Sequence, residues 1–432
     1  MADPVTRTVG AAPSESDAPG LPTASPLSSI ALLDPSAQIG GAERVLIDVV
    51  ASVRAVRPAI NFLAVLSGDG PLAVELRELG VSVQTLPFPV SVAALGDSPT
   101  ASDGSGSRAL IRTALAAPDV FRYARSLRQL LHDFGPSVVH SNGAKMHLLS
   151  ALACHGVAPI IWHLHDFIGS RPFMRVALKQ LSARCSAIIA NSESVAEDAR
   201  LSIRGSMPTH TVLNAVNLDR FNPLGPTLDL DALAGVSPAA FGTVRVGLVA
   251  TFAKWKGHET FFRSIAAIPR TIPVRAYVVG GPLYETRGSQ FSLEELRHMV
   301  AQLGVSDRIA FTGHTEDVAA AMRALNVVVH ASTQPEPFGL VIAEAMACGR
   351  PVVTSGTGGA REAAEGLPAW LTVRSADSDG IASAVTRLVS DADLRARLGA
   401  TGRRIAEERF DRARLSRELI PVYERLARQY QS

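Results

Sequence analysis

Short apolar runs recur along the chain, and helical patterns separate most of them. In the first half the runs cover Ile30–Leu33, Phe62–Leu66, Val81–Leu86, Val138–Val139, Ile160–Trp162 and Ala187–Ala190. The helical patterns include Arg44–Val56, Leu72–Leu79 and Val120–Phe134. Strands that are apolar throughout and alternate with helices are typical of a parallel sheet covered by helices on both faces. The pattern therefore predicts a doubly wound α/β domain in the first half.

The same rhythm stops and then restarts. Polar turn residues over Asn214–Pro223 follow a short expected strand at Val212–Leu213. Apolar runs return at Val244–Ala250, Ala276–Val279, Ile309–Phe311, Val327–His330, Val352–Thr354 and Leu371–Val373. We expect two doubly wound domains, residues 28–216 and 217–412, followed by a helix within 413–432 that covers Leu415–Gln429. Ligands bind at the carboxyl ends of the strands in such sheets, so the site should lie in a cleft between the domains.

Composition agrees with this division and excludes some classes of function. A chain of 432 residues is too long for one ordinary core, and 47% hydrophobic with 19% charged residues is a normal globular balance. The formal net charge is only +2, and aromatic and basic residues do not interleave. Neither feature suggests nucleic-acid binding.

The cysteines and the absence of a signal or membrane span favour a protein of a reducing compartment. Residues 1–27 are rich in Ala, Pro, Ser and Asp and are expected to form a disordered tail. No apolar run reaches the roughly 18 residues of a membrane span, and the start does not resemble a secretory signal. Cys154, Cys185 and Cys348 are expected to be buried free thiols. From these features we expect a cytoplasmic protein.

A low-complexity loop is expected over Gly96–Arg108.

One stretch, residues 335–353, combines a loop, a helix and a strand in a way that indicates chemistry. Pro335 and Pro337 prevent regular structure at its start. A small-residue helix is expected from about Gly339 to Cys348, and Gly349 should end it in a left-handed turn.

The start of that helix has the outline of a nucleotide-sugar site. The free amides of Phe338, Gly339 and Leu340 and the positive end of the helix dipole would favour a phosphate. Glu336 precedes the helix and Glu344 lies within it, so both carboxylates could accept hydroxyl groups of the same ligand.

Two further segments could contact phosphate. Lys254 and Lys256-Gly257 follow the strand Val244–Ala250, where an ammonium group can reach a phosphate; alternatively they are a solvated lysine pair. The Gly40-Gly41 pair follows the first strand, where glycines permit close backbone approach to a ligand, although an ordinary loop fits equally well.

Histidines and acidic residues suggest acid–base chemistry more than metal binding. His165-Asp166 follows the strand Ile160–Trp162 and could act as a polar or acid–base element, or be structural. No third ligand has the spacing for zinc. Asp229 and Asp231 have the spacing of a metal-binding pair, but they lie in a linker-like segment, so coincidence is the better interpretation. We therefore expect no essential metal.

Two other segments have less specific patterns. Gly356–Arg361 lacks the third small residue of a dinucleotide loop, so NAD binding is rejected, although the amides of Gly358 and Gly359 could still approach an anion. Arg171–Lys179 mixes basic and apolar residues and fits either contact with an anionic membrane surface or an ordinary surface helix.

The assembled motifs resemble the retaining glycosyltransferases of family four, whose two Rossmann-like domains form the GT-B fold. The most specific element is Glu336-Pro337-Phe338-Gly339-Leu340 with Glu344. Supporting elements are Gly40-Gly41-Ala42-Glu43, His165-Asp166, Asn191-Ser192, Asn214-Ala215-Val216-Asn217, Lys256-Gly257, Gly280-Gly281 and Phe311-Thr312-Gly313-His314.

The resemblance implies a role for each of these residues. Glu336 would contact the transferred sugar and Glu344 the ribose, while Lys256 and the amides of Phe338, Gly339 and Leu340 would hold the diphosphate. The Gly40-Gly41 loop would approach the donor from the other domain, and His165 would lie near the sugar and acceptor. Gly313-His314 would lie beside the base, and the final helix would pack on the first domain.

The sequence departs from the family at one point. Where the family often carries Arg-Leu about five residues before the lysine, this chain has Thr251-Phe252. A charge-assisted contact worth roughly 1.5–3 kcal/mol is lost there, and Lys254 could replace it by reaching inward.

The implied reaction is metal-independent transfer of a hexose-type sugar, with retention, from a nucleotide-diphosphate sugar to a glycan or lipid-linked acceptor. The donor is a co-substrate, and no cofactor is expected. Peripheral contact with the inner membrane is compatible with such an acceptor. The alternatives are an epimerase or phosphorylase on the same fold, or an inactive relative that serves as a partner subunit.

Overall fold

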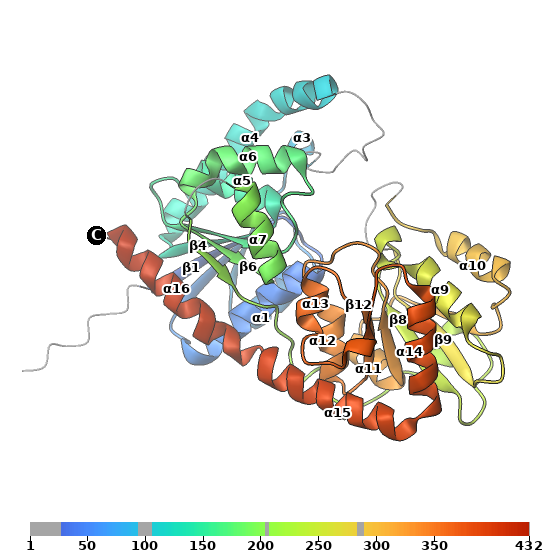
Figure 1. Ribbon diagram of the computed structural model, residues 1–432. Helices are drawn as coiled ribbons and strands as arrows, with labels where there is room; N and C mark the ends of the chain where they lie inside the picture. The colour runs from blue at the N-terminus through green and yellow to red at the C-terminus, as the bar shows by residue number, and fades with distance from the viewer. Residues whose placement is uncertain (1–26, 94–105, 204–206, 283–288, 432) are drawn as a thin grey trace, which may run out of the picture.

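The first domain is built on a parallel sheet. The computed structural model describes residues 27–93, 106–203, 207–282 and 289–431, and these form two α/β domains (Figure 1). The strand order of the first sheet is β3-β2-β1-β4-β5-β6-β7. Its strands are β1 Ser29–Asp34, β2 Asn61–Leu66, β3 Ser82–Thr85, β4 Val138–Asn142, β5 Ile160–Leu164, β6 Ala187–Ala190 and β7 Thr209–Thr211.

Helices cover both faces of this sheet because each face is apolar. The helices are α1 Gly41–Val56, α2 Pro71–Glu78, α3 Val90–Ala93, α4 Gly106–Phe134, α5 Ala144–Ala153, α6 Pro172–Leu181 and α7 Glu193–Ser202, with a 3-10 turn at Ser182–Arg184. Helices α1 and α2 share one core with the C-terminal helix, and α4 to α7 share the other.

The second domain repeats the design with the strand order β10-β9-β8-β11-β12-β13. Its strands are β8 Val244–Val249, β9 Val274–Val279, β10 Ile309–Gly313, β11 Val327–His330, β12 Val352–Ser355 and β13 Thr372–Val373. Its helices are α8 Leu230–Ala234, α9 His258–Ala267, α10 Leu293–Gln302, α11 Val318–Ala324, α12 Leu340–Ala347, α13 Gly359–Ala363, α14 Ser378–Ser390 and α15 Ala392–Arg409, with 3-10 turns at Lys254–Lys256 and Ala369–Leu371. The final helix, α16, covers Ala413–Gln431.

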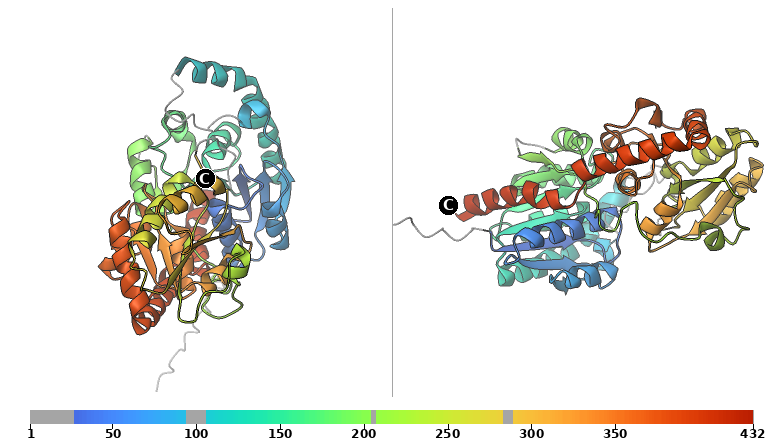
Figure 2. Two further views of the ribbon diagram at one scale, coloured as in Figure 1. Left: turned by 90° about the vertical axis from the view of Figure 1, so that its right-hand side faces the viewer. Right: turned by 90° about the horizontal axis from the view of Figure 1, so that it is seen from below.

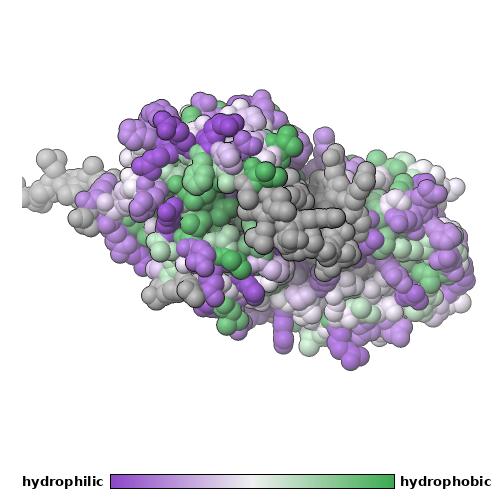
Figure 3. Space-filling model, turned by 90° about the horizontal axis from the view of Figure 1, so that it is seen from above, coloured by the Kyte–Doolittle hydropathy of each residue, from purple (hydrophilic) through white to green (hydrophobic). Residues whose placement is uncertain are grey.

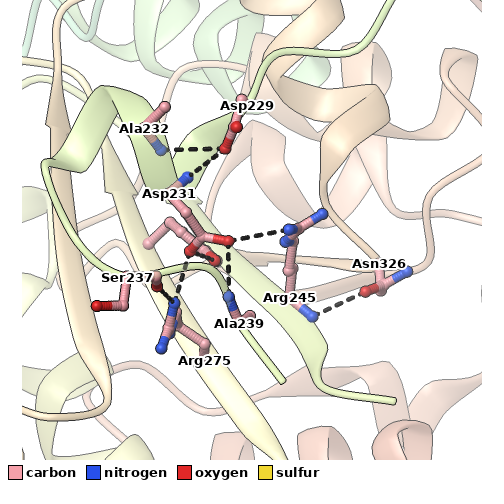
Figure 4. A network of polar contacts seen from close by, with 9 residues as sticks. Asp229, Asp231, Ala232, Ser237, Ala239, Arg245, Arg275 and Asn326 are labelled. Atoms are coloured by element: carbon pink, nitrogen blue, oxygen red, sulfur yellow. Dashed lines mark hydrogen bonds and ion pairs between the residues drawn. The ribbon is translucent and has the colours of Figure 1, made fainter. Parts of the chain in front are cut away.

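A buried carboxylate joins α8 to the second sheet (Figure 4). Asp231 accepts hydrogen bonds from Tyr277 Oη at 2.6 Å, Arg275 Nη1 at 2.7 Å and Arg245 Nη2 at 3.0 Å. Burial alone would raise the pKa of Asp231, but the Tyr277 hydroxyl, the Ala239 amide and the two arginines outweigh it and hold that pKa well below its usual range. The acidic pair at 229 and 231 is therefore structural: Asp229 caps α8 through the amides of Asp231 and Ala232.

The chain passes between the domains twice, and the two crossings lie side by side. The Val216 amide donates to Phe410 O at 2.7 Å, and the Arg412 amide donates to Val216 O at 3.3 Å. Beyond this point α16 continues the line of α15 along the first domain (Figure 2). It packs on α1, where the Ser416 amide donates to Ser52 Oγ at 2.9 Å.

The predicted fold class is confirmed, with local differences. The strand expected at Val212–Leu213 lies earlier, at Thr209–Thr211, and only Thr372–Val373 of the last run forms a strand. Helix α4 begins at Gly106, so the expected loop is shorter at that end, and its residues 96–105 lie outside the described residues. Residues 1–26 of the expected tail also lie outside, whereas Leu27 is buried in the first core.

A second contact joins the domains through one carboxylate. Glu362 of α13 accepts the Glu193 amide at 2.7 Å, the Ser194 amide at 2.8 Å and the Ser194 hydroxyl at 2.6 Å. These donors form the first turn of α7, where the helix dipole favours a negative charge. The contact holds α13 against α7 and stabilises the arrangement of the two domains.

We predict that Glu362→Ala increases the mean separation of the domains, because charge-assisted contacts of this kind contribute roughly 1.5–3 kcal/mol each. Small-angle X-ray scattering of the unliganded protein should show a larger radius of gyration. Glu365→Ala is the matched control, because Glu365 lies three residues further on and pairs with Arg409, also of the second domain. Identical scattering from Glu362→Ala and the wild type would contradict the prediction.

Candidate active site

A cavity of about 580 Å³ lies between the domains and is lined by residues of both. The first domain contributes, among others, Gly41, Glu43, His165, Asn191 and Asn214. The second contributes Thr251, Trp255, Lys256, Glu336 and the first residues of α12. These residues follow the carboxyl ends of strands, as the predicted topology requires.

Glu336 is held in the cavity by three side chains. Its carboxylate contacts the ammonium of Lys256 and the Nε2 atom of His330, and it accepts the Ser332 hydroxyl at 2.7 Å. Burial alone would raise the pKa of Glu336, but the charges of Lys256 and His330 hold it well below its usual range. Glu336 is therefore an anion with a fixed orientation.

The backbone of this loop depends on glycines in the next loop. The Gly359 amide donates to Glu336 O at 2.8 Å, and Glu336 and Gly358 form a parallel bridge. A Cβ atom at Gly359 would lie 2.0 Å from Pro337 O. The Gly359 amide is thus used inside the protein, and the two glycines position the Glu336 loop.

Lys256 ends a 3-10 turn and is held from two sides. Its Nζ atom lies 4.0 Å from the centroid of the Trp255 ring and also pairs with Glu336. Gly257 has φ 76°, and a Cβ atom there would lie 1.9 Å from Ala331 O. The Thr333 amide donates to Trp255 O at 2.8 Å, so a backbone hydrogen bond joins the loops after β8 and β11.

The first turn of α12 faces the same cavity. Phe338, Gly339 and Leu340 line it, and Gly339 has φ 87° at the N-cap position. Phe338 is buried, with its ring 5.7 Å from that of Phe410 at the interdomain crossing. The helix start is therefore anchored to the segment that connects the domains.

On the opposite wall, His165 is oriented by a buried chain of polar groups. Its Nε2 atom contacts Asn142 Oδ1, and Asn142 Nδ2 donates to Asp34 Oδ2 at 2.6 Å. Burial, and next the charge of His140, lower the pKa of His165 to about 3, so the ring is neutral. Burial and the Glu43 charge raise the pKa of Asp34 to about 8.

Behind His165 the polar chain continues to the final helix. The His163 and His165 rings lie 4.1 Å apart between centroids, and His163 Nδ1 lies 3.1 Å from His140 Nε2. His140 Nδ1 in turn lies 2.9 Å from Tyr423 Oη of α16. The C-terminal helix therefore completes the surroundings of the cleft wall.

Several predicted residues lie elsewhere. Lys254, considered above as a possible inward-reaching contact, has an exposed side chain with Nζ 5.6 Å from the centroid of Phe291. His314 is exposed and, like Gly313, lies outside the main cavity. The Gly40 amide is bonded to Glu43, and only Gly41 of that pair lines the cavity.

Glu344 lies in a neighbouring cavity of about 340 Å³, which Leu340 shares with the main one. Burial raises the pKa of Glu344 to about 7, opposed by the charges of Arg220 and Arg44. Asp48 lies on the opposite wall, and burial raises its pKa also to about 7. Two carboxyl groups from different domains thus titrate near neutrality in one cavity.

Sequence reasoning missed the groups that orient the predicted residues. His330 and Asn142 each end a strand, and Ser332 lies two residues beyond β11. Their position near strand ends was visible in the sequence, but their partners come from separate loops.

The cavity as a whole can hold an anion beside Lys256 and the start of α12, and it can bind hydroxyl groups at Glu336.

Two parallel-sheet domains that face each other across such a cleft define the GT-B class. A family model described as "Glycosyltransferase Family 4" matches residues 71–220, and one described as "Glycosyl transferases group 1" matches residues 243–391. The lipopolysaccharide core biosynthesis mannosyltransferase LpsB of Rhizobium meliloti is 30% identical over 258 residues, which are 58% of this chain and 68% of that protein. The chain belongs to glycosyltransferase family 4.

Other relatives agree with this placement. D-inositol 3-phosphate glycosyltransferase of Corynebacterium jeikeium is 30% identical over 233 residues, 52% of this chain and 54% of that protein. The chain spans about half the length of the first curated relatives that it matches. The structure of Anabaena HepE in complex with UDP-glucose has a TM-score of 0.72 and 25% identity, covering 92% of this chain and all of that one. Sucrose-phosphate synthase from Thermosynechococcus elongatus, at 19% identity and a TM-score of 0.70, shares the fold.

The described residues contain neither a cluster of metal ligands nor a membrane-spanning helix. No group of three or more His, Cys, Asp or Glu side chains there is arranged to hold a metal ion. No helix in the described part of the chain is both long and apolar enough to cross a bilayer.

We predict that Asp48→Asn flattens the pH dependence of stability. The pKa of Asp48 is raised from 3.8 to about 7, so the folded state holds this proton more tightly than the unfolded state. Its contribution to stability is full at low pH and is lost as pH rises from about 4 to about 7. Urea unfolding across this range should show a smaller decline for Asp48→Asn than for the wild type. The exposed Asp69→Asn is the control, and an equal decline in both variants would contradict the prediction.

Proposed function

We propose that the protein is a retaining glycosyltransferase that moves a hexose-type sugar from a nucleotide-diphosphate sugar to a hydroxyl of a glycan or glycolipid acceptor. The observation that carries the proposal is the Lys256–Glu336 pair beside the first turn of α12, inside a cleft lined by both domains. The pair supplies a cation for a diphosphate and a fixed anion for sugar hydroxyls within one cavity.

The donor would lie across the second domain. Lys256 and the amides at the start of α12 would receive the diphosphate, because both are positive and need no metal. Glu336 would accept hydroxyl groups of the transferred sugar, and Glu344 would meet the ribose through the adjoining cavity. HepE, which shares 25% identity, was crystallised with UDP-glucose, and this supports a nucleotide-sugar donor here.

The chemistry would depend on electrostatic stabilisation of the leaving diphosphate. Glu336 is already bonded to three donors, so its role is to orient the sugar, and it is a poor candidate for a nucleophile. With the diphosphate held on one face, the acceptor hydroxyl can attack from that same face, which gives retention. Preorganised charges of this kind supply most of the rate in many enzymes.

We predict that Lys256→Met lowers sugar transfer roughly 100-fold or more, because the developing charge on the diphosphate loses its cation. Transfer from UDP-glucose and GDP-mannose would be followed by release of the nucleoside diphosphate, with EDTA present throughout. Lys254→Met is the matched control, because Lys254 lies outside the cavity. It should retain wild-type activity.

Three results would contradict parts of this proposal. Equal activity of Lys256→Met and the wild type would remove Lys256 from the site. Loss of activity in EDTA, restored by a divalent cation, would overturn metal independence. A product of inverted anomeric configuration, read by NMR, would overturn retention, and a changed donor sugar without acceptor would indicate an epimerase.

The first domain, on which the acceptor would bind, has a face suited to anionic lipid. On α6, Phe173 is 44% and Val176 57% exposed, beside the exposed Arg175. On α4, Phe121 is 68% exposed, beside the exposed Arg122. Seen from above, the face that carries α4 and α6 in Figure 1 shows apolar areas among hydrophilic ones (Figure 3). We propose that this face makes peripheral contact with the inner membrane, where a lipid-linked acceptor would lie.

We predict that the double variant Phe173→Ser, Arg175→Glu weakens binding to vesicles of phosphatidylglycerol and phosphatidylcholine at least about fivefold, because charge and apolar contact are both lost. Co-sedimentation measures it. The control is Arg263→Glu on α9 of the second domain. Equal binding of both variants, or no binding of the wild type, would contradict membrane contact through this face.

A further inference from the structure

The cation on the second domain's side of the cleft is carried by a flexible side chain. Among the described residues of that domain that line the cavity, Lys256 is the one cation. A lysine side chain has a long, flexible stem and loses much conformational freedom when its ammonium group is fixed. The groups that restrain Lys256 therefore determine how well this wall is prepared for an anion.

Two side chains restrain the Lys256 ammonium, and they differ in charge. The carboxylate of Glu336 pairs with it, and the Trp255 ring lies against it, with Nζ 4.0 Å from the ring centroid. A carboxylate neutralises the cation that it holds. The face of an indole ring attracts a cation through its quadrupole and adds no countercharge. Trp255 therefore orders Lys256 and leaves its charge available to a ligand.

The position of Trp255 is itself fixed by the second domain. Trp255 is the middle residue of the 3-10 turn Lys254–Lys256, and its carbonyl accepts the Thr333 amide at 2.8 Å and the Thr333 hydroxyl at 3.2 Å. Thr333 belongs to the loop that carries Glu336. Trp255 is half-buried and lines the cavity. The indole, the ammonium and the carboxylate are thus held by one pair of bonded loops.

A second tryptophan of the same domain provides an internal comparison. The guanidinium carbon of the exposed Arg387 lies 4.4 Å from the centroid of the Trp370 ring. Neither Trp370 nor Arg387 lines the cavity between the domains. Contact between a tryptophan and a cation therefore does not mark a site by itself. Trp255 differs because the cation that it holds faces the cavity.

We propose that Trp255 is a positioning residue for the donor, and that it holds the Lys256 ammonium toward the diphosphate of a nucleoside-diphosphate sugar. The proposal rests on the proposed function. With the donor bound, the ammonium divides its N–H groups between Glu336 and the diphosphate oxygens, which weakens the restraint from Glu336. The ring contact persists in both states and keeps the ammonium in place.

A double-mutant cycle tests whether Trp255 acts through Lys256. Affinities for UDP and GDP are measured by calorimetry, or by ligand-observed NMR where binding is weak. Trp255→Leu should weaken binding of the nucleotide that the wild type prefers by about fivefold, because the ammonium loses its restraint. In the Lys256→Met background the same substitution should change the affinity less than about twofold, because the residue through which it acts is gone.

Two further variants separate positioning from general destabilisation. Trp255→Phe keeps an aromatic face and should bind the nucleotide at least about twofold more tightly than Trp255→Leu does. Trp370→Leu is the matched control, because it removes a tryptophan–cation contact outside the cavity, and it should leave the affinity unchanged. Equal binding by Trp255→Phe and Trp255→Leu, or a comparable loss in Trp370→Leu, would overturn the proposal.

The outcomes separate this role from the proposed function. If Lys256→Met weakens nucleotide binding and Trp255→Leu does not, or if the two losses add in the double variant, the positioning role is wrong while the donor site stands. If Lys256→Met binds UDP and GDP as the wild type does, or if neither nucleotide binds the wild type, the donor assignment fails, and the positioning role fails with it.

Discussion

The position of one buried carboxylate depends on much of the second domain. Glu336 is held by Lys256, His330 and Ser332, and its backbone pairs with the glycine loop after β12. An unpaired carboxylate at this depth would take up a proton. The cation and the two other donors keep it charged, so three loops must lie in register for the site to exist. The packing of β8, β11 and β12 as neighbours supplies that register.

The first domain contributes a different set of side chains to the cleft. His165 lines the cavity with His163 and His140 behind it, and burial keeps these histidines uncharged. Glu43, Lys145, Asp166 and Arg171 of the same domain also line the cavity. The final helix contributes Tyr423 beside His140, so the last residues of the chain support the first domain.

Among the described residues, two sets of hydrogen bonds help to connect these halves. The paired crossings at Val216 and Phe410 join the backbones, and Glu362 bonds to the first turn of α7. Between them, the cavity holding Glu344 and Asp48 brings two titratable carboxyl groups from opposite domains together. Both carboxyl groups have raised pKa values because the interface between the domains buries them.

The sequence by itself determined the two sheets and the helix after residue 339, because periodicity and helix-ending glycines are local properties. The pattern at the helix start and the family resemblance also singled out Glu336 and Lys256, which both line the cavity. The sequence left Lys254 as a possible second phosphate contact, and the two lysines are distinguished only by the contacts of Lys256 with Trp255 and Glu336 and by the close approach of Gly257 to Ala331. The partners of His165 were also decided by tertiary structure. Hydrogen bonding in a buried site depends on which strand ends become neighbours, and that order is set by the packing of whole domains.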